Sequence, residues 1–171
     1  MLFRSILTNS QASNDVPIVH ANYSKYRLQL TKGGVNLFEL RRRGAPVTDH
    51  DVHRRAFGSA NSSLHAKTFV IDRKQVFIGS LNLDPRSVVH NTEVGVLVES
   101  PELAKSVAGS IRTLQSPAWS YRLVMTNKGK LNWVGDDSNG KEIRFECDPD
   151  TTWWDRFKNG LMGLLPVQGQ T

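Results

Sequence analysis

The sequence predicts an α/β fold in which a mixed β-sheet is flanked by helices. Short segments rich in β-branched and aromatic residues alternate with longer segments whose apolar residues recur at helical spacing. Two strand-like segments, residues 4–8 and 35–40, enclose a helical one, and strands connected in this way pair in parallel. With 171 residues, 39% of them hydrophobic, the chain is expected to form one domain, or one domain with a tail.

The helix of this first β-α-β unit is expected to run from residue 15 to residue 32. Asp15 is a suitable N-cap, and Pro17 suits the first helical turn. The apolar side chains at helical spacing are Val19, Tyr23, Tyr26 and Leu30. Gly33 and Gly34 end the helix before the second strand.

A long polar connection, residues 41–63, leads to the next strand, and connections of this length are often functional or disordered. Its basic and titratable side chains are Arg41, Arg42, Arg43, Arg54, Arg55, His50 and His53. The arginines are compatible with binding an anionic headgroup, with binding a nucleic-acid backbone, and with a solvated loop that binds neither. The two histidines are interpreted as surface residues.

Residues 64–72 and 75–78 are predicted to form a β-hairpin with a polar turn between them. Side chains alternate along a strand, so His65 and Lys67 point to the same side. A neutral imidazole can attack phosphorus or transfer a proton, and a neighbouring lysine neutralises the non-bridging oxygens. On spacing alone, an exposed His and Lys on an edge strand are an equally good interpretation.

Polar residues follow the hairpin. Gly79, Ser80 and Asn82 end its second strand, where they offer a close backbone approach, a hydroxyl and an amide to an anion. Residues 92–99 alternate as a further strand. On this strand Glu93 either fixes the tautomer of the imidazole or is an ordinary solvent-facing residue.

The rest of the chain is predicted as one helix, three short strands and an amphipathic tail. The helix opens at residues 100–102. Its expected buried stripe is Leu103, Val107, Ile111 and Leu114. The strands at residues 121–125, 131–134 and 142–146 are expected to form a peripheral antiparallel subsheet.

The tail follows a predicted half-domain over residues 1–150 and occupies residues 151–171, with a helix at residues 152–166. The apolar side chains of that helix are Trp153, Phe157, Leu161 and Leu164 on one face, with Trp154 and Leu165 beside them. Tandem tryptophans next to basic residues suit a membrane interface, and packing on the domain's own core is the alternative. Gly160 and Gly163 weaken the helix.

The segment from residue 65 to residue 82 resembles the HKD motif of the phospholipase D superfamily. The motif reads His65-x-Lys67-x4-Asp72, followed by Gly79-Ser80-x-Asn82. Residues 91–95 resemble the family's next segment, and residues 6–10 and 83–87 are similar to the C-terminal half of its cardiolipin-synthase branch. The resemblance covers most of the chain and implies one half of the family's two-lobed, pseudo-dimeric α/β fold.

The resemblance also implies roles for the motif residues. The family's histidine forms a phosphohistidine intermediate while a lysine and an asparagine hold the phosphate, which assigns these roles to His65, Lys67 and Asn82. Ser80 belongs to the same phosphate-binding segment. Glu93 corresponds to the glutamate that orients the histidine, and Asp72 to the motif aspartate, counted with the catalytic set but more structural in its role. No Cys/His cluster has metal spacing, so no cofactor is expected.

The sequence departs from the family pattern because it holds one HKD motif. The family's enzymes place two motifs face to face, so that one histidine attacks and the other protonates the leaving oxygen. Here only His65 is followed by x-Lys, and the chain is expected to supply half an active site. The second HKD half would come from a homodimer or from a missing N-terminal half, which the start at a strand favours.

Charge and composition indicate which class of binding partner to expect and where the chain is located. A net charge of +6 favours an anionic partner, and the single Cys147 and the lack of a spanning or signal segment favour a cytoplasmic chain, peripheral on the inner face of the cell membrane. The leading hypothesis is a phospholipase D-type phosphodiesterase or phosphatidyltransferase that acts on anionic phospholipids. The alternatives are a homodimeric, single-motif nuclease that acts on nucleic acid, and an inactive half-domain.

Overall fold

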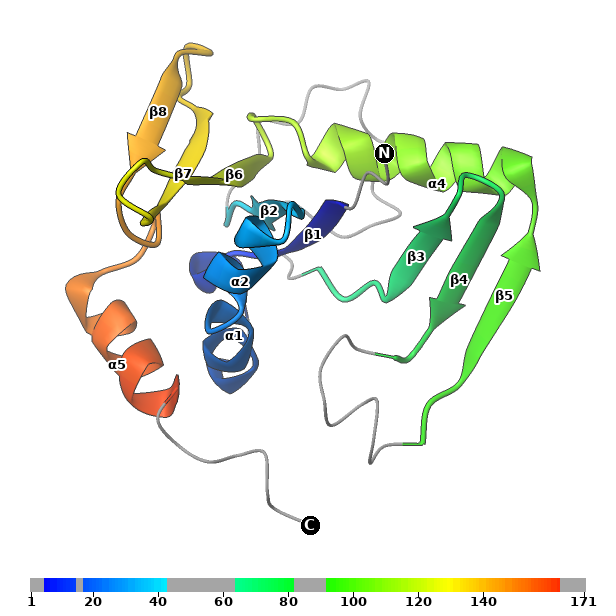
Figure 1. The fold of residues 1–171 in the computed structure, drawn as a ribbon, viewed down its shortest axis with the longest axis horizontal. Coiled ribbons are helices and arrows are strands. Elements are labelled where there is room, and N and C mark those ends of the chain that lie inside the picture. Colours follow the sequence, from blue (N-terminus) through cyan, green and yellow to red (C-terminus); the bar gives the residue numbers. More distant parts are fainter. Residues whose placement is uncertain (1–4, 15–16, 43–63, 82–91, 164–171) are drawn as a thin grey trace. The chain divides into compact units, whose positions relative to one another are not determined.

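The computed structural model describes residues 5–14, 17–42, 64–81 and 92–163. These residues divide into two compact units (Figure 1). The first unit combines the chain up to residue 64 with residues 114–163, and the second comprises residues 65–113. The boundary at residue 150 between a half-domain and a tail stays a prediction.

The first unit is built on a five-stranded sheet in the order β1-β2-β6-β7-β8. Its strands are β1 (Ser5–Asn9), β2 (Asn36–Leu40), β6 (Ser120–Met125), β7 (Leu131–Asp136) and β8 (Glu142–Phe145). β1 and β2 pair in parallel, with Ser5 opposite Asn36, and the other neighbours are antiparallel. The mixed sheet and its parallel pair confirm the predicted fold class.

Helices accompany this sheet. They are the short 3₁₀ turn η1 (Gln11–Ser13), α1 (Pro17–Ser24), α2 (Arg27–Lys32) and α5 (Trp153–Gly163). α2 lies against β2 and β6, and α5 lies beside α1 (Figure 1). The C-terminal helix therefore packs on an N-terminal one, and its half-buried side chains are Arg156 and Asn159.

The prediction of one continuous helix over residues 15–32 is wrong. α1 ends at Ser24, whose hydroxyl donates to the Ala21 carbonyl at 2.9 Å, and the Tyr26 N–H donates to the Tyr23 carbonyl at 2.9 Å. These local bonds replace the regular helical ladder. α2 then begins at Arg27, which is buried, and ends before Gly33 as predicted.

The prediction of a peripheral subsheet after residue 120 is also wrong. β6 pairs directly with β2, with Phe38 opposite Arg122, so β6, β7 and β8 continue the sheet of β1 and β2. The buried core lies across this junction and consists of Leu37, Tyr121, Leu123 and Trp133. Its formation depends on a pairing between segments far apart in the chain, which local patterns do not encode.

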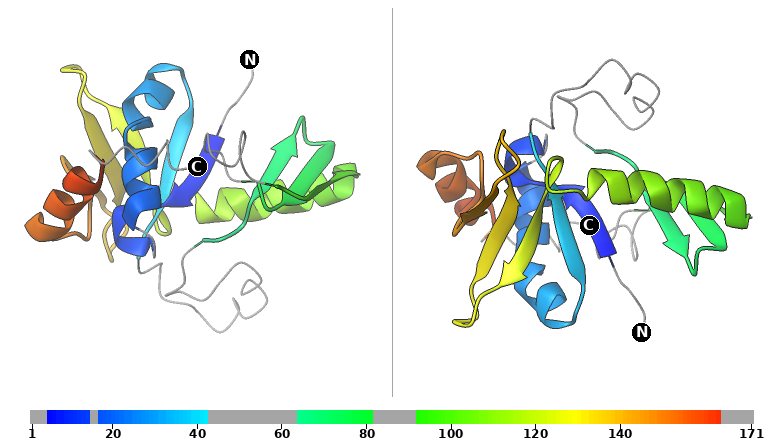
Figure 2. Two further views of the ribbon diagram at one scale, coloured as in Figure 1. Left: turned by 90° about the horizontal axis from the view of Figure 1, so that it is seen from below. Right: turned by 90° about the horizontal axis from the view of Figure 1, so that it is seen from above.

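The second unit is a three-stranded antiparallel sheet with a helix alongside it (Figure 2). Its elements are β3 (Thr68–Ile71), β4 (Gln75–Gly79), β5 (Gly95–Glu99) and α4 (Pro101–Leu114). The predicted hairpin is confirmed: Asp72 and Arg73 have φ of 50° and 56°, and the Lys74 N–H donates to the Ile71 carbonyl at 3.0 Å. These values describe a type I′ turn, which matches the twist of the two strands.

The strands of this unit begin later than predicted. β3 starts at Thr68, so His65 and Lys67 lie in the segment that leads into it. β5 starts at Gly95, so Glu93 likewise precedes its strand. His65, Lys67 and Glu93 therefore lie at the end of the sheet opposite the type I′ turn, where regular pairing ends, whereas the candidate residue Asp72 lies in the turn itself.

α4 begins as predicted. The Leu103 N–H donates to Ser100 Oγ at 3.2 Å, which is an N-cap, and the Ser100 N–H donates to the Lys74 carbonyl at 2.9 Å. Ala104 is its one fully buried side chain among the described residues, and the predicted stripe is partly buried. Within the described ranges, no helix has the length and apolar character needed to cross a membrane.

Candidate functional site

His65 and Lys67 meet directly. Lys67 Nζ lies 2.7 Å from His65 Nε2 and 3.4 Å from the His65 carbonyl oxygen. An ammonium only donates hydrogen bonds, so Nε2 is the acceptor in this contact. The His65 side chain is exposed, and its Nε2 lone pair is engaged by Lys67.

The backbone around Lys67 is held by the hairpin. The Gly79 N–H donates to the Lys67 carbonyl at 3.2 Å, which extends the β3–β4 ladder by one residue beyond β3. A Cβ atom at Gly79 would lie 2.6 Å from the Val94 carbonyl oxygen and 2.8 Å from Gly95 Cα. Only glycine permits this close approach of three chain segments.

Two aromatic rings share the face of the sheet on which Lys67 lies. Phe69 and Phe77 are paired across β3 and β4, with ring centroids 5.4 Å apart. The Phe77 ring also covers Gly95, where an added Cβ would lie 2.2 Å from Cζ. Sequence reasoning missed this aromatic support, although the alternation of Lys67, Phe69 and Ile71 was a signal for it.

Ser80 and Glu93 are brought together by the β4–β5 pairing. Ser80 Oγ donates to Glu93 Oε2 and accepts a hydrogen bond from the Val94 N–H at 3.0 Å, while the Ser80 N–H donates to the Val94 carbonyl at 2.8 Å. The hydroxyl proton is therefore directed to a carboxylate. The predicted roles of Ser80 in phosphate binding and of Glu93 in orienting His65 stay predictions.

The structure does not bring every predicted residue together. Asp72 occupies the first central position of the type I′ turn, five residues from Lys67 along the chain. At the rise of a strand, that separation is roughly 17 Å. Asn82 lies outside the described residues, as do Arg43, Arg54, Arg55, His50 and His53.

Of the arginine run, Arg41 has a structural role. Its Nη1 donates to the carbonyl oxygens of Asp136, at 2.7 Å, and Pro117, at 3.2 Å, and its guanidinium lies 4.4 Å from the centre of the Tyr121 ring. A cleft of about 440 Å³ is lined by Arg41, Arg42, Tyr121 and Asp150. Arg42 is exposed at this cleft, and for Arg42 the predicted binding of an anion stays a prediction.

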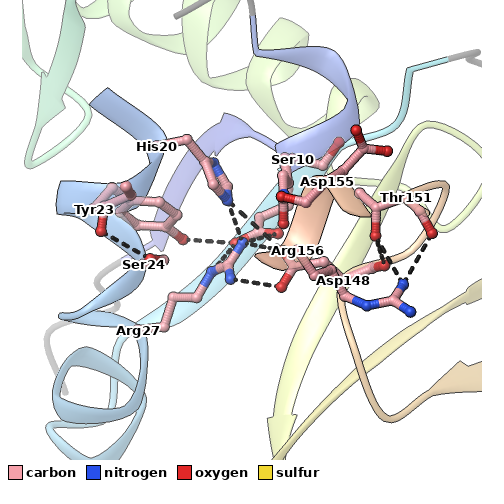
Figure 3. A network of polar contacts seen from close by, with 12 residues as sticks. Ser10, His20, Tyr23, Ser24, Arg27, Asp148, Thr151, Asp155 and Arg156 are labelled. Carbon is pink, nitrogen blue, oxygen red and sulfur yellow. Dashed lines mark hydrogen bonds and ion pairs between the residues drawn. The ribbon is translucent and has the colours of Figure 1, made fainter. Parts of the chain in front are cut away.

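Sequence reasoning also missed a buried cluster of charged groups in the first unit (Figure 3). Arg27 donates to Glu39 Oε1 at 2.7 Å, to Asp148 Oδ1 at 2.7 Å, and contacts His20 Nε2 at 2.9 Å. Burial raises the pKa of Asp148, but the hydrogen bond with His20 and the charge of Arg27 outweigh this and hold it below its usual value. Glu39 shares a strand face with the core residue Leu37, and this alternation was the available signal.

The cluster connects the C-terminal segment to the β-α-β unit. Asp148 follows β8, whereas Arg27 begins α2 and Glu39 lies on β2. Burial raises the pKa of the nearby Tyr23 hydroxyl, which donates to Glu39 Oε1 at 3.1 Å. Because every one of these contacts lies within the first unit, we interpret the cluster as structural support for the sheet.

Comparison with known proteins identifies the family. Residues 5–114 match the family described as cardiolipin synthase, PLD-like domain. The chain is 45% identical over 166 residues to cardiolipin synthase C of Escherichia coli (strain K12), a match that covers 96% of this chain and 34% of that protein. It is 32% identical over 164 residues to an uncharacterized protein of Helicobacter pylori, covering 95% of this chain and 30% of that protein.

The chain also matches a second cardiolipin synthase over a shorter stretch. Cardiolipin synthase B of Escherichia coli (strain K12) is 33% identical over 88 residues, which cover 52% of this chain and 17% of that protein. The chain thus spans 34% and 30% of the length of its two longer-matching relatives, and no solved structure matches it. The family match runs from β1 to α4 and includes His65 and Lys67, and the chain belongs to the phospholipase D-like family of the cardiolipin synthases.

Proposed function

We propose that this chain carries one catalytic half of a phospholipase D-type phosphodiesterase or phosphatidyltransferase that acts on phospholipids. The contact of 2.7 Å between Lys67 Nζ and His65 Nε2 carries the proposal, since it places an imidazole nitrogen, which can act as a nucleophile, beside a cation that can neutralise phosphate oxygens. The names of the relatives, cardiolipin synthases C and B, support a phospholipid substrate.

In the proposed reaction, Nε2 of His65 attacks the phosphorus of a phospholipid. The new N–P bond forms as the bond from phosphorus to the leaving alcohol breaks, and Lys67 turns from Nε2 to the non-bridging oxygens. A histidine of a second HKD half protonates the leaving oxygen. The hydroxyl of a second lipid, or water, then attacks phosphorus, gives up its proton to that histidine and releases Nε2.

The other site residues support this step. Glu93 would accept a hydrogen bond from the Nδ1–H of His65 and so orient the ring. The Ser80 hydroxyl in turn donates a hydrogen bond to the Glu93 carboxylate. Asn82 would contact the phosphate, and Ser80 would do so by turning its hydroxyl proton from Glu93 to a phosphate oxygen. For Asp72 we propose the role of a turn residue, because its backbone lies in the left-handed region.

We propose that a second HKD half completes the site, either from a second copy or from a longer chain. One His-x-Lys sequence is present, and the chain spans 34% of cardiolipin synthase C. Apolar side chains on β4, β5 and the segment before β5 are exposed, as surfaces that another half covers would be. Ile78 and Val96 pair on one face of the sheet, Leu97 lies on the opposite face, and Val94 precedes β5.

The test is to trap the intermediate. The chain is incubated with phosphatidylglycerol or with DNA, without metal, and the adduct is located by mass spectrometry under alkaline conditions. We expect a phosphatidyl group on His65 of the wild type and none on His65→Ala, with Lys67→Met at least about 100-fold slower. Lys74→Met, an exposed lysine in the turn of the same hairpin, is the matched control and should react normally.

The same experiment separates the alternatives. An adduct with DNA alone would replace the lipid substrate by nucleic acid. No adduct with either substrate, together with a solution mass of 19.2 kDa rather than twice that value, would identify an incomplete half-domain. An adduct that persists in His65→Ala would refute the assignment of the nucleophile.

A further inference from the structure

One side of α5 is fixed to the first unit. Arg156 Nη1 donates to the Thr151 carbonyl at 2.9 Å and to Thr151 Oγ1 at 3.1 Å, and Gln11 Nε2 donates to the Asp155 carbonyl at 2.8 Å. Thr152 and Asp155 exchange hydrogen bonds as a capping box, with the Asp155 N–H donating to Thr152 Oγ1 at 3.2 Å. Together with the packing of α5 against α1, these contacts fix the orientation of α5 on the first unit.

The other side of α5 carries an aromatic surface, here named the α5 plateau: Trp153, Trp154, Phe157 and Leu161. Their exposed fractions are 67%, 53%, 49% and 58%. The three rings stack on one another, with centroids 5.8 Å apart for Trp153 and Trp154 and 5.5 Å for each of them with Phe157. Four large apolar side chains in one place, each about half exposed, form a contiguous patch of the kind that marks an interaction surface.

Charged side chains of both signs flank the plateau, Lys158 and Asp155. Lys158 Nζ lies 5.6 Å from the centre of the Trp154 ring. Hydrogen bonds from Thr152 hold the pKa of the Asp155 carboxyl below its usual value, with smaller contributions from Lys158 and Arg42. The Asp155 carboxylate therefore stays ionised and keeps its hydrogen bond with Thr152. The plateau therefore offers indole rings and an ammonium together.

This combination favours a bilayer over a protein partner. Tryptophan and lysine both gather at membrane interfaces, where the ring lies at the level of the headgroups and the ammonium meets lipid phosphate. Lysine is depleted in protein–protein interfaces, whose centres lose their charged residues. The net charge of +6 adds attraction to an anionic lipid surface.

We propose that the α5 plateau inserts into the interface of a bilayer that contains anionic phospholipids, with Lys158 beside a headgroup phosphate. The proposal rests on the proposed function, since a phospholipid-processing site needs access to a membrane. It names the element that makes the contact, α5, which lies outside residues 5–114, the region that the family model matches.

The test uses the full chain with vesicles of phosphatidylcholine, with and without phosphatidylglycerol. Tryptophan emission should shift to shorter wavelength on binding, and lipids brominated along the acyl chain should quench it. The variant W153S/W154S/F157S should lose at least about 100-fold in partitioning, given the apolar area that three half-exposed rings bury. Met125→Ser, an exposed apolar residue on β6, should bind as the wild type does.

Lys158→Glu separates the electrostatic part. It should weaken binding to vesicles with phosphatidylglycerol by about 25-fold and leave binding to phosphatidylcholine nearly unchanged, since it removes one positive charge and adds a negative one, and each such charge near an anionic surface contributes a factor of about five. Circular dichroism and thermal melting establish that each variant is folded. Because the plateau side chains are exposed, all of the variants are expected to fold.

Two results would overturn the proposal. One is unchanged vesicle binding by the triple variant. The other is a wild-type dimer in light scattering that the triple variant converts to a monomer, with no vesicle binding by either, which would make a second copy the occupant. Failure of the proposed function looks different: wild type and triple variant would both leave monomerically dispersed, short-chain phosphatidylglycerol unreacted while the wild type still binds vesicles.

Discussion

Arg27 and Glu39 form a buried ion pair in which Nε meets Oε1 at 2.7 Å and Nη2 meets Oε2 at 3.0 Å. The Glu39 side chain is completely buried, and Trp133 Nε1 donates to its Oε2 at 2.9 Å. The guanidinium also binds Asp148, so one cation faces two carboxylates. Each group in this cluster is stabilised only as long as the others keep their charge.

Replacing Arg27 by methionine should therefore destabilise the first unit strongly. The change leaves Glu39 and Asp148 without a counter-charge in a buried site, and loss of one partner of a buried pair costs about 3–5 kcal/mol. Urea unfolding measures the free energy. The matched control is Arg144→Met, since Arg144 pairs with Glu142 on the surface and its loss should cost at most about 1 kcal/mol. Equal losses in both variants would contradict the assigned role of the cluster.

The cluster also predicts how stability depends on pH. The pKa of Asp148 is lower in the folded chain than in the unfolded one, so the unfolded state binds more protons as the pH approaches the unfolded value of about 4. The stability that Asp148 contributes is fully present above that value and is lost as the pH falls through the folded pKa. The difference in unfolding free energy between wild type and Asp148→Asn should be constant near neutrality and shrink in acid. A difference that grows in acid would contradict the sign.

The sequence predicts local features of this fold well. The turn at Asp72 and Arg73 and the cap at Ser100 each depend on a few neighbouring residues, and the parallel pairing of β1 with β2 follows from the β-α-β order of the segments. The proximity of His65 and Lys67 was likewise predicted, because two residues of alternation suffice to place them together.

The features that were missed depend on partners distant in the sequence. A glutamate is expected at the surface from its residue type. Glu39 is instead buried beside Arg27 and Trp133, and its burial follows from the pairing of β2 with β6. The contact of Arg27 with Asp148 likewise joins α2 to a segment 121 residues further along the chain. Neither contact is visible in a local window of sequence.

Gly79 gives a third prediction, on the second unit. Gly79→Ala should destabilise the unit by about 1–3 kcal/mol, because its Cβ would lie 2.6 Å from the Val94 carbonyl oxygen, beside Ser80 and Glu93. Thermal unfolding and the rate of adduct formation at His65 both report the change. Gly109→Ala is the control, since that glycine lies within α4 with open space around it. Alanine there should raise the free energy of unfolding by about 0.5–1 kcal/mol. Unchanged stability and rate in Gly79→Ala would show that the close approach is not needed.

Asp72 provides the last prediction, which separates a turn role from a catalytic one. Its φ of 50° lies in the left-handed region, where asparagine is tolerated and a β-branched residue is strained. Asp72→Asn should therefore keep both stability and the rate of adduct formation at His65, although it removes the charge. Asp72→Val should lower the unfolding free energy by about 1–2 kcal/mol through backbone strain. If Asp72→Asn folds normally but reacts as slowly as His65→Ala, the carboxylate takes part in the reaction and its position in the turn is incidental.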